Sequence, residues 1–231
     1  MYNKFFKRFL DFVLSLFAII VLSPLLIVLI VVGAIAMKGN PFFIQPRPGR
    51  KGKDGKETIF KLLKFRSMSS AKDKNGNLLP DDIRLNAYGR FLRSTSFDEL
   101  GELWNILVGD LSIVGPRPQL VRDMVFMTEE QRRRHNVRPG LTGLAQISGR
   151  NNITWEEKFE WDLKYIDGGI TFFKDAMIII RTVLKVLKRE DTVREGTASD
   201  VDFGDWLLAN GNVAELEYTK KQEEAKELLR I

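Results

Sequence analysis

The hydrophobic residues of this chain are concentrated in one nearly unbroken run at positions 10–37, LDFVLSLFAIIVLSPLLIVLIVVGAIAM. The run is longer than the roughly 20 residues that an α-helix needs to cross the hydrocarbon core of a bilayer. A cleaved signal peptide would have a shorter apolar core and a small-residue cleavage site before polar sequence, and neither is present. The pattern therefore predicts a membrane helix.

A proline lies near the middle of the run, and basic residues flank both of its ends. Pro24 removes a backbone donor and clashes with the preceding turn, so we expect the helix to break or kink at Ser23-Pro24, where the Ser23 hydroxyl can satisfy a freed carbonyl. Basic residues beside a membrane segment favour the cytoplasmic side of the membrane, so both ends of this segment would prefer that side. A re-entrant helix that returns to its own leaflet satisfies both observations, and a kinked spanning helix with its N-terminus outside is the alternative. The flanking residues are Lys4, Lys7, Arg8, Lys38, Arg47, Arg50, Lys51 and Lys53.

Beyond the membrane segment the pattern changes to short apolar runs and amphipathic stretches. Runs at 42–44 and 58–65, joined by a turn rich in Gly, Lys and Asp, predict a β-hairpin. The polar segment 72–82 predicts an exposed loop. Helical periodicity at 155–166 and 175–190 predicts two amphipathic helices, whose apolar faces suit either the membrane surface or the core. The stretch from Thr192 onward predicts a loop and a charged, solvated helix.

The segment at 90–118, RFLRSTSFDELGELWNILVGDLSIVGPRP, contains a further helical pattern. Its apolar residues recur at the spacing of one buried helix face. Ser96, with Glu99 three residues later, fits a capping box, so we expect a helix from Ser96 to Gly109 with Asp98 and Glu99 in its first turn. The residues of the apolar face are Leu100, Leu103, Trp104, Leu107 and Val108.

Composition limits the chemistry that the chain can perform. Its 231 residues, 44% of them hydrophobic, suffice for one compact unit. The chain has no cysteine, and His135 is its only histidine, which excludes disulfides, thiolate nucleophiles and the usual zinc sites. The net charge of +6 implies an anionic partner: nucleic acid, phospholipid head groups or a phosphorylated substrate. Catalysis would therefore use carboxylates, hydroxyls, Lys or Arg.

Asp98 and Glu99 are the leading candidates for such chemistry. Acidic residues in a first turn are ordinary because they complement the helix dipole, but basic residues surround this pair in the sequence. An arginine guanidinium binds two phosphate oxygens at once. Any one of the basic residues around the pair could equally be an ordinary surface charge. Together they predict a phosphoryl-transfer site, in which one carboxylate attacks phosphorus and its neighbour holds Mg²⁺. The basic residues are Lys64, Arg66, Arg90, Arg93, Arg117 and Arg150.

Several motifs follow one another over about residues 1–190: KRFLDFVLSL…SP, FIQPRPG, FKLLKFRSM, RSTSFDEL, WNILVGDLSIVGPRP and VRPGLTGLAQISGRN. In this order they resemble the bacterial sugar transferase family of monotopic phosphoglycosyl transferases. The closest resemblance is to small members that act on UDP-N,N'-diacetylbacillosamine in glycoprotein assembly. The resemblance implies an α+β, predominantly α fold: a re-entrant membrane helix broken at Ser23-Pro24 within residues 1–38, and a catalytic region at 39–195 with a small β-hairpin and amphipathic membrane-surface helices. Residues 196–231 would be an extension without an assigned role.

The resemblance also implies a Mg²⁺-dependent reaction at the cytoplasmic face of the bacterial inner membrane. Asp98 would attack the β-phosphate of a UDP-sugar, releasing UMP, and undecaprenyl phosphate would then accept the phosphosugar, which begins glycoconjugate assembly. Glu99 matches the family's magnesium-associated carboxylate. Its phosphate- and nucleotide-proximal basic positions correspond to Lys64, Arg93, Arg117 and Arg150.

The residues leave one other class of function open. A noncatalytic peripheral membrane protein could bind anionic phospholipids through the same basic flanks and amphipathic helices. Nucleic-acid binding is disfavoured because the basic residues form no recognised module. The identity of the sugar and the oligomeric state cannot be read from the sequence.

Overall fold

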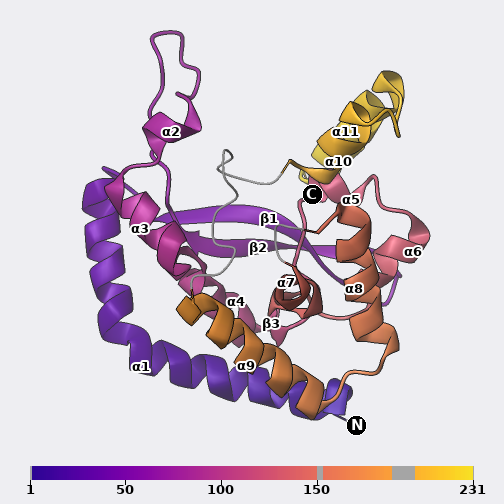
Figure 1. The fold of residues 1–231 in the computed structure, drawn as a ribbon. Helices are drawn as coiled ribbons and strands as arrows, with labels where there is room; N and C mark the ends of the chain where they lie inside the picture. The colour runs from indigo at the N-terminus through magenta and orange to yellow at the C-terminus, as the bar shows by residue number, and fades with distance from the viewer. Residues whose placement is uncertain (1, 150–152, 189–200, 231) are drawn as a thin grey trace.

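In a computed structural model of the chain, which describes residues 2–149, 153–188 and 201–230, the hydrophobic run forms one long helix, α1 (Lys7–Ala36), after a π-helical turn, η1 (Tyr2–Phe6). Figure 1 shows α1 following two sides of the molecule, with a bend midway along it. The Ser23 hydroxyl donates to the Ile20 carbonyl at 2.8 Å, and this is the carbonyl that Pro24, lacking an N–H, leaves free. The predicted break is therefore a bend in a continuous helix, because the Ser23 hydroxyl replaces the missing donor.

Most of the apolar surface of α1 is uncovered. The helix is long and apolar enough to cross a membrane, and 11% of its 18-residue hydrophobic window is buried. Apolar surface of this extent is typical of contact with lipid. Membrane association through α1 is thus supported, whereas re-entry into the same leaflet stays a prediction. The exposed side chains include Phe9, Phe17, Ile20, Val21, Ile27 and Ile35.

Polar side chains dock the beginning of α1 onto the rest of the protein. Lys7 and Asp11, one turn apart on the same helix face, are both buried. The Lys7 ammonium lies 2.6 Å from the carboxylate of Asp175. Asp11 accepts hydrogen bonds from the Ser112 hydroxyl at 2.8 Å and from the Ile113 N–H at 3.0 Å. The N-terminal end of the membrane helix is therefore fixed relative to the segments that follow it.

The predicted β-hairpin is confirmed. Strands β1 (Phe42–Lys51) and β2 (Glu57–Phe65) pair antiparallel in a register that places Phe42 opposite Phe65. β1 is longer than the predicted run because it continues through two prolines, which a two-stranded ribbon tolerates on its open edge. Segment 72–80 follows as a largely exposed loop, as predicted, with one bridge between Lys72 and Leu78, whereas positions 81 and 82 of the predicted loop begin a short helix.

The helix predicted from Ser96 to Gly109 is two elements. Ser96 has left-handed backbone torsions (φ 57°) and ends α3 (Ala87–Thr95); a 3₁₀ turn, η2 (Phe97–Gly101), and α4 (Glu102–Val108) follow. The capping box is wrong: the Ser96 side chain forms no cap hydrogen bond, because its left-handed backbone makes it the end of one helix rather than the start of the next. Gly109 (φ 101°) ends α4, as predicted.

The remaining elements build two apolar clusters, one of which includes Val114 of a short strand, β3. β3 pairs in parallel with another short strand, β4, and the sequence pattern predicted neither strand. Strands of three residues are too short for an alternating pattern to be recognised. Their bounds, and those of the other elements, are α2 (Asp81–Arg84), β3 (Ser112–Val114), α5 (Val121–Met124), α6 (Glu129–Arg132), η3 (Arg133–Asn136), β4 (Gly140–Thr142), α7 (Leu144–Ser148), α8 (Trp155–Asp167), α9 (Phe172–Lys188), α10 (Phe203–Ala209) and α11 (Glu215–Leu228).

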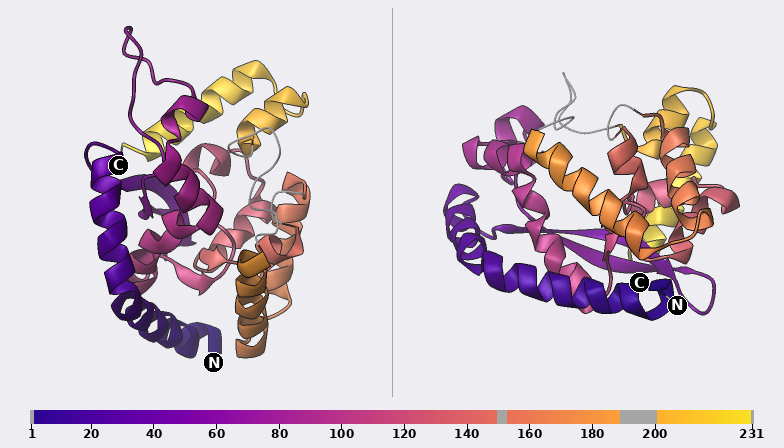
Figure 2. Two further views of the ribbon diagram at one scale, coloured as in Figure 1. Left: turned by 60° about the vertical axis from the view of Figure 1, so that its left-hand side comes forward. Right: turned by 60° about the horizontal axis from the view of Figure 1, so that its bottom comes forward.

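The two predicted amphipathic helices exist and differ in their surroundings. α8 packs into the core through Trp155, Phe159 and Tyr165. α9 buries Ile178 but exposes a second apolar face, and its N-terminal end meets that of α1 (Figures 1 and 2). A partly uncovered apolar face is typical of a helix at a lipid surface. Positions 189 and 190 of the predicted helix lie outside the described residues. The exposed residues of α9 include Phe172, Phe173, Ile180, Val183 and Leu184.

The predicted charged helix is confirmed as α11, which is largely exposed, but α10 before it was not predicted and is docked, which corrects the prediction of a solvated appendage. Positions 192–200 of the predicted loop lie outside the described residues. Phe203 is 4% exposed and packs against Trp155 and Phe159. The Arg122 guanidinium lies 2.6 Å from Asp205 at the start of α10. The prediction was wrong because apolar residues spaced three and four apart within a charged tail bury one face of α10 despite its polar surroundings.

Candidate active site

The adjacent carboxylates Asp98 and Glu99 lie in η2, which packs on β2. A Cβ atom at Gly101 would lie 2.7 Å from the Leu63 carbonyl oxygen, so the approach of η2 to the strand requires glycine. This contact places the two carboxylates beside Lys64, the next residue of β2. A short turn held against a strand thus brings together residues that are distant in sequence.

Lys64, Arg117 and Glu99 form a connected charge cluster. The Lys64 ammonium lies 3.2 Å from Glu99 Oε1 and 3.1 Å from Glu102 Oε1. The Arg117 Nη2 donates to the same Glu99 oxygen at 2.5 Å. One carboxylate oxygen is therefore held by two cations, which fixes the orientation of the Glu99 side chain.

The two adjacent carboxyls have pKa values shifted in opposite directions. Burial opposes ionisation of Glu99, but the charges of Arg117 and Lys64 outweigh burial and hold its pKa well below the ordinary value. Burial raises the pKa of Asp98, and the charge of Glu99 raises it further. Lys64, Arg117 and Arg93 oppose this rise only in part. Neighbouring carboxyls with divergent pKa values are typical of sites where the two groups have different roles.

Hydrogen bonds from two other arginines hold the backbone carbonyls of Arg117 and Pro118. The Arg134 guanidinium donates to the Arg117 carbonyl at 2.6 Å and to the Asp162 carboxylate at 2.6 Å. Arg47 donates to the Pro118 carbonyl at 3.1 Å. Arg117 itself remains 41% exposed at its side chain, so it has surface available for an anionic ligand while its backbone is held rigidly.

Of the other predicted site residues, the structure brings Arg93 to this cluster. Arg93 lies at the end of α3, bonds the Ser67 hydroxyl at 3.2 Å and lowers the pKa of Asp98. Arg66 instead donates to the Phe42 carbonyl at 3.3 Å and to the Ser70 hydroxyl at 3.2 Å, and so supports the end of the hairpin rather than the carboxylates. Arg150 lies outside the described residues.

Sequence reasoning missed three residues of the cluster and its support. Glu102 is 2% exposed and shares Lys64 with Glu99. Its position three residues after Glu99 was an available signal, because residues with this spacing share a helix face. Arg47 and Arg134 gave no signal, because their contacts with the loop around Arg117 join positions 71 and 17 residues apart in the sequence.

His135 is remote from this chemistry. It is 4% exposed, and its Nδ1 lies 3.1 Å from Glu57, which Arg132 also binds. Burial lowers the pKa of His135 to about 4, although the hydrogen bond with Glu57 opposes this shift. The imidazole is therefore neutral near pH 7 and serves as a buried structural group.

The carboxylates suit a magnesium ion that is shared with substrate. Among the described residues, no group of three or more His, Cys, Asp or Glu side chains is arranged to hold a metal ion. Mg²⁺ commonly takes a carboxylate or two and completes its coordination with substrate phosphates and water. Glu99, ionised and oriented by Arg117 and Lys64, provides a donor of this kind beside Asp98.

Comparison with known proteins gives consistent matches over most of the chain. Residues 2–189 match the family described as "Bacterial sugar transferase". An uncharacterised sugar transferase EpsL from Bacillus subtilis is 47% identical over 184 residues, covering 80% of this chain and 88% of that protein. A UDP-glucose:undecaprenyl-phosphate glucose-1-phosphate transferase from Klebsiella pneumoniae is 39% identical over 193 residues, and an undecaprenyl-phosphate galactose phosphotransferase from Salmonella typhimurium is 34% identical over 206 residues. The matches cover 79% and 81% of this chain, but only 40% and 42% of those two proteins.

Proposed function

The chain belongs to the bacterial sugar transferase family, and from this premise we propose that it transfers a sugar 1-phosphate from a UDP-sugar to undecaprenyl phosphate, with release of UMP. The observation that supports the proposal most directly is the Asp98-Glu99 pair beside Lys64 and Arg117, because it combines a nucleophile with cations that bind phosphate oxygens. The product, undecaprenyl-diphosphate-sugar, would begin glycoconjugate or polysaccharide assembly.

Asp98 is assigned as the nucleophile and Glu99 as the metal-associated carboxylate. An Asp98 oxygen forms a bond to the β-phosphorus, and the bond from that phosphorus to the bridging oxygen breaks, so UMP leaves with the bridging oxygen. An oxygen of undecaprenyl phosphate then attacks the same phosphorus and releases the Asp98 carboxylate. Neither step needs a histidine base, because a carboxylate oxygen and a phosphate oxygen are the nucleophiles, and neither has to lose a hydroxyl proton in order to attack. Glu99 suits attack poorly, since two cations hold one of its oxygens and lower its pKa.

The basic residues of the cluster position the diphosphate. Arg117, with its partly exposed guanidinium on a rigid backbone, would bind the non-bridging oxygens, and Lys64 and Arg93 would add positive charge beside the nucleophile. Mg²⁺ bound through Glu99 would supply further neutralisation of the diphosphate charge. The negative charge of the transferred group is thereby balanced in a site that already holds two carboxylates.

Release of UMP by the detergent-solubilised protein tests the reaction. With Mg²⁺ and undecaprenyl phosphate, one member of a panel of UDP-sugars should give sustained release, and omission of the lipid should limit release to about one equivalent per enzyme, the amount that a covalent intermediate allows. We propose an N-acetylated amino sugar such as UDP-N,N'-diacetylbacillosamine as the donor, and UDP-glucose and UDP-galactose, the sugars in the names of relatives, are the comparison. Folded protein that releases no UMP with any donor would favour a noncatalytic, lipid-binding role.

The proposed location is the cytoplasmic face of the inner membrane, with α1 re-entering the same leaflet. Because the chain lacks cysteine, the variants Asn3→Cys and Asp82→Cys each carry a single thiol, one on either side of α1. Both positions are exposed. A membrane-impermeant maleimide applied to spheroplasts should label neither variant until the membrane is permeabilised. Labelling of Asn3→Cys from outside would instead identify a kinked helix that spans the membrane.

A further inference from the structure

A polar cavity lies at the opposite end of α4 from the Asp98-Glu99 pair. It has a volume of about 330 Å³ and is lined by residues of η1 and α1, the end of β1 and the segment before β4. A smaller hollow of about 180 Å³ adjoins it and shares Arg50 and Arg138 with it. None of the residues that line the cavity belongs to the charge cluster around Asp98 and Glu99. The cavity is therefore distinct from the candidate active site.

The lining of the cavity is strongly cationic. It contains Lys7, Arg8, Arg50 and Arg138 against one carboxylate, Asp11. Both oxygens of Asp11 already accept hydrogen bonds from Ser112 and Ile113, and Lys7 is paired with Asp175 outside the lining. Three guanidinium groups are thus left without a carboxylate within ion-pair distance in the described part of the chain.

Two of these guanidinium groups are held in place by the end of α4. Arg8 donates to the carbonyls of Ile106 and Leu107 at 2.6 and 2.7 Å, and Arg138 donates to the carbonyl of Gly109 at 2.8 Å. Cations at a helix C-terminus are stabilised by its exposed carbonyls. These bonds use only some of the N–H donors of each guanidinium, so donors remain for a ligand.

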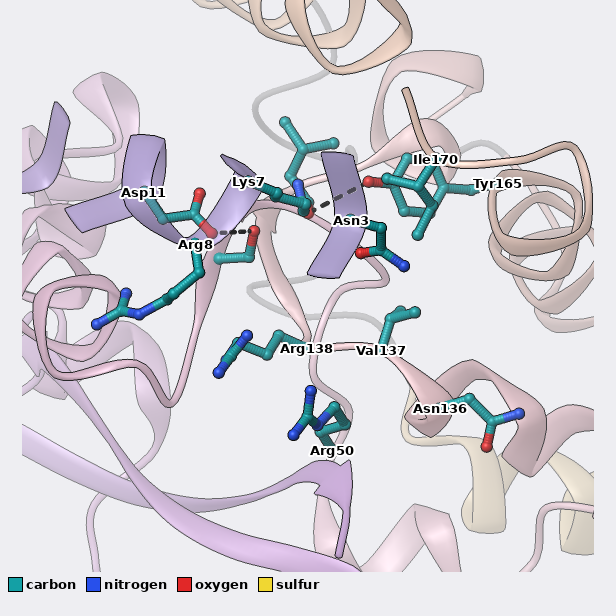
Figure 3. Close-up of a pocket in the computed structure, with 12 residues that line it drawn as sticks. Asn3, Lys7, Arg8, Asp11, Arg50, Asn136, Val137, Arg138, Tyr165 and Ile170 are labelled. Carbon is teal, nitrogen blue, oxygen red and sulfur yellow. Dashed lines mark hydrogen bonds between the residues drawn. The ribbon is translucent and has the colours of Figure 1, made fainter. Parts of the chain in front are cut away.

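Arg50 provides the third guanidinium and lies beside Arg138 (Figure 3). Arg50 is exposed, and its guanidinium makes no hydrogen bond or ion pair within the described residues. Burial lowers the pKa of Arg138, and the like charges of Arg50 and Arg8 lower it further. An oxyanion between these groups would relieve this repulsion and accept several charge-assisted hydrogen bonds.

We propose that this cavity binds the phosphate group of an anionic membrane lipid. The position of the cavity supports a lipid source, because its lining comes from the beginning of α1 and from Ile170, just before α9. Large apolar side chains are exposed at these ends, among them Phe5 of η1, Phe9 of α1, and Phe172 and Phe173 of α9. Acyl chains can therefore lie along these faces while the phosphate enters the cavity.

Native mass spectrometry of the full chain in detergent, titrated with phosphatidylglycerol or phosphatidylcholine, tests the proposal. The wild type should retain phosphatidylglycerol at lower concentrations than phosphatidylcholine. Arg50→Gln should weaken retention of phosphatidylglycerol about tenfold, the effect of losing one charge-assisted hydrogen bond. Lys53→Gln, which removes an equal and exposed charge from the neighbouring turn, should leave retention unchanged.

A competition with inorganic phosphate identifies the source of the phosphate group. If phosphate displaces the lipid from the wild type but has no effect with Arg50→Gln, the cavity is an oxyanion site that also accepts soluble phosphate. If phosphate does not displace the lipid, the site is specific for the lipid. Equal retention of the two lipids, or equal losses with Arg50→Gln and Lys53→Gln, would overturn the proposal. Asp98→Asn should bind phosphatidylglycerol like the wild type, so failure of the proposed catalytic role would not affect this result.

Discussion

Replacing Asp98 by Asn is expected to lower UMP release by roughly a thousandfold or more while the protein stays folded. The amide is nearly isosteric with the carboxylate but cannot attack phosphorus. Burial and the charge of Glu99 raise the pKa of Asp98, so the native carboxylate is already destabilised, and its replacement by a neutral amide should not reduce stability. Steady-state UMP release with undecaprenyl phosphate, together with the thermal unfolding midpoint, measures both effects.

A single-turnover experiment without the lipid acceptor makes this test specific to the nucleophile. The wild type should release about one equivalent of UMP and retain the phosphosugar, whereas Asp98→Asn should release none. Asp82→Asn, the same change at an exposed carboxylate in α2, should behave like the wild type. A stoichiometric burst from Asp98→Asn would place the nucleophile at another residue.

Replacing Asp162 by Asn is expected to cause a large loss of stability. Asp162 and Arg134 form an ion pair at 2.6 Å whose side chains are 3% and 1% exposed. Loss of the carboxylate leaves a buried guanidinium without its counter-charge, at a cost of about 3 kcal/mol or more. For a chain of this size the thermal unfolding midpoint should fall by roughly 10 °C.

The matched control for Asp162→Asn is Asp167→Asn on the same helix, α8. Asp167 pairs with Arg133, but its side chain is 51% exposed, and exposed ion pairs contribute about 0–1 kcal/mol. Asp167→Asn should therefore shift the midpoint by no more than about 2–4 °C. Because Arg134 also holds the Arg117 carbonyl, Asp162→Asn should lower UMP release at temperatures where it is still folded. Equal midpoints for the two variants would show that the buried pair does not stabilise the fold.

Local patterns predicted those elements whose determinants are close together in sequence. The hairpin β1–β2, helix α8 and the end of α4 at Gly109 agree with the predictions because alternation, helical periodicity and a glycine with positive φ act within a few residues. The prediction at Ser96 was wrong because it used a local signal alone. Serine followed by glutamate fits a helix start, but packing of η2 on β2 gave Ser96 a left-handed conformation that no local signal required.

The sequence by itself determined the membrane helix, its bend at Pro24, and the set of charged residues available for chemistry, because these follow from hydrophobicity, backbone covalent structure and composition. Only the tertiary structure decided how the charges are arranged. It joined Lys64 to Glu99 and Glu102, attached Arg134 to the backbone of Arg117, directed Arg66 elsewhere, and gathered Arg8, Arg50 and Arg138 around a separate cavity. Each of these contacts joins segments distant in the chain, and burial there determines which charges are paired and which remain available to a ligand.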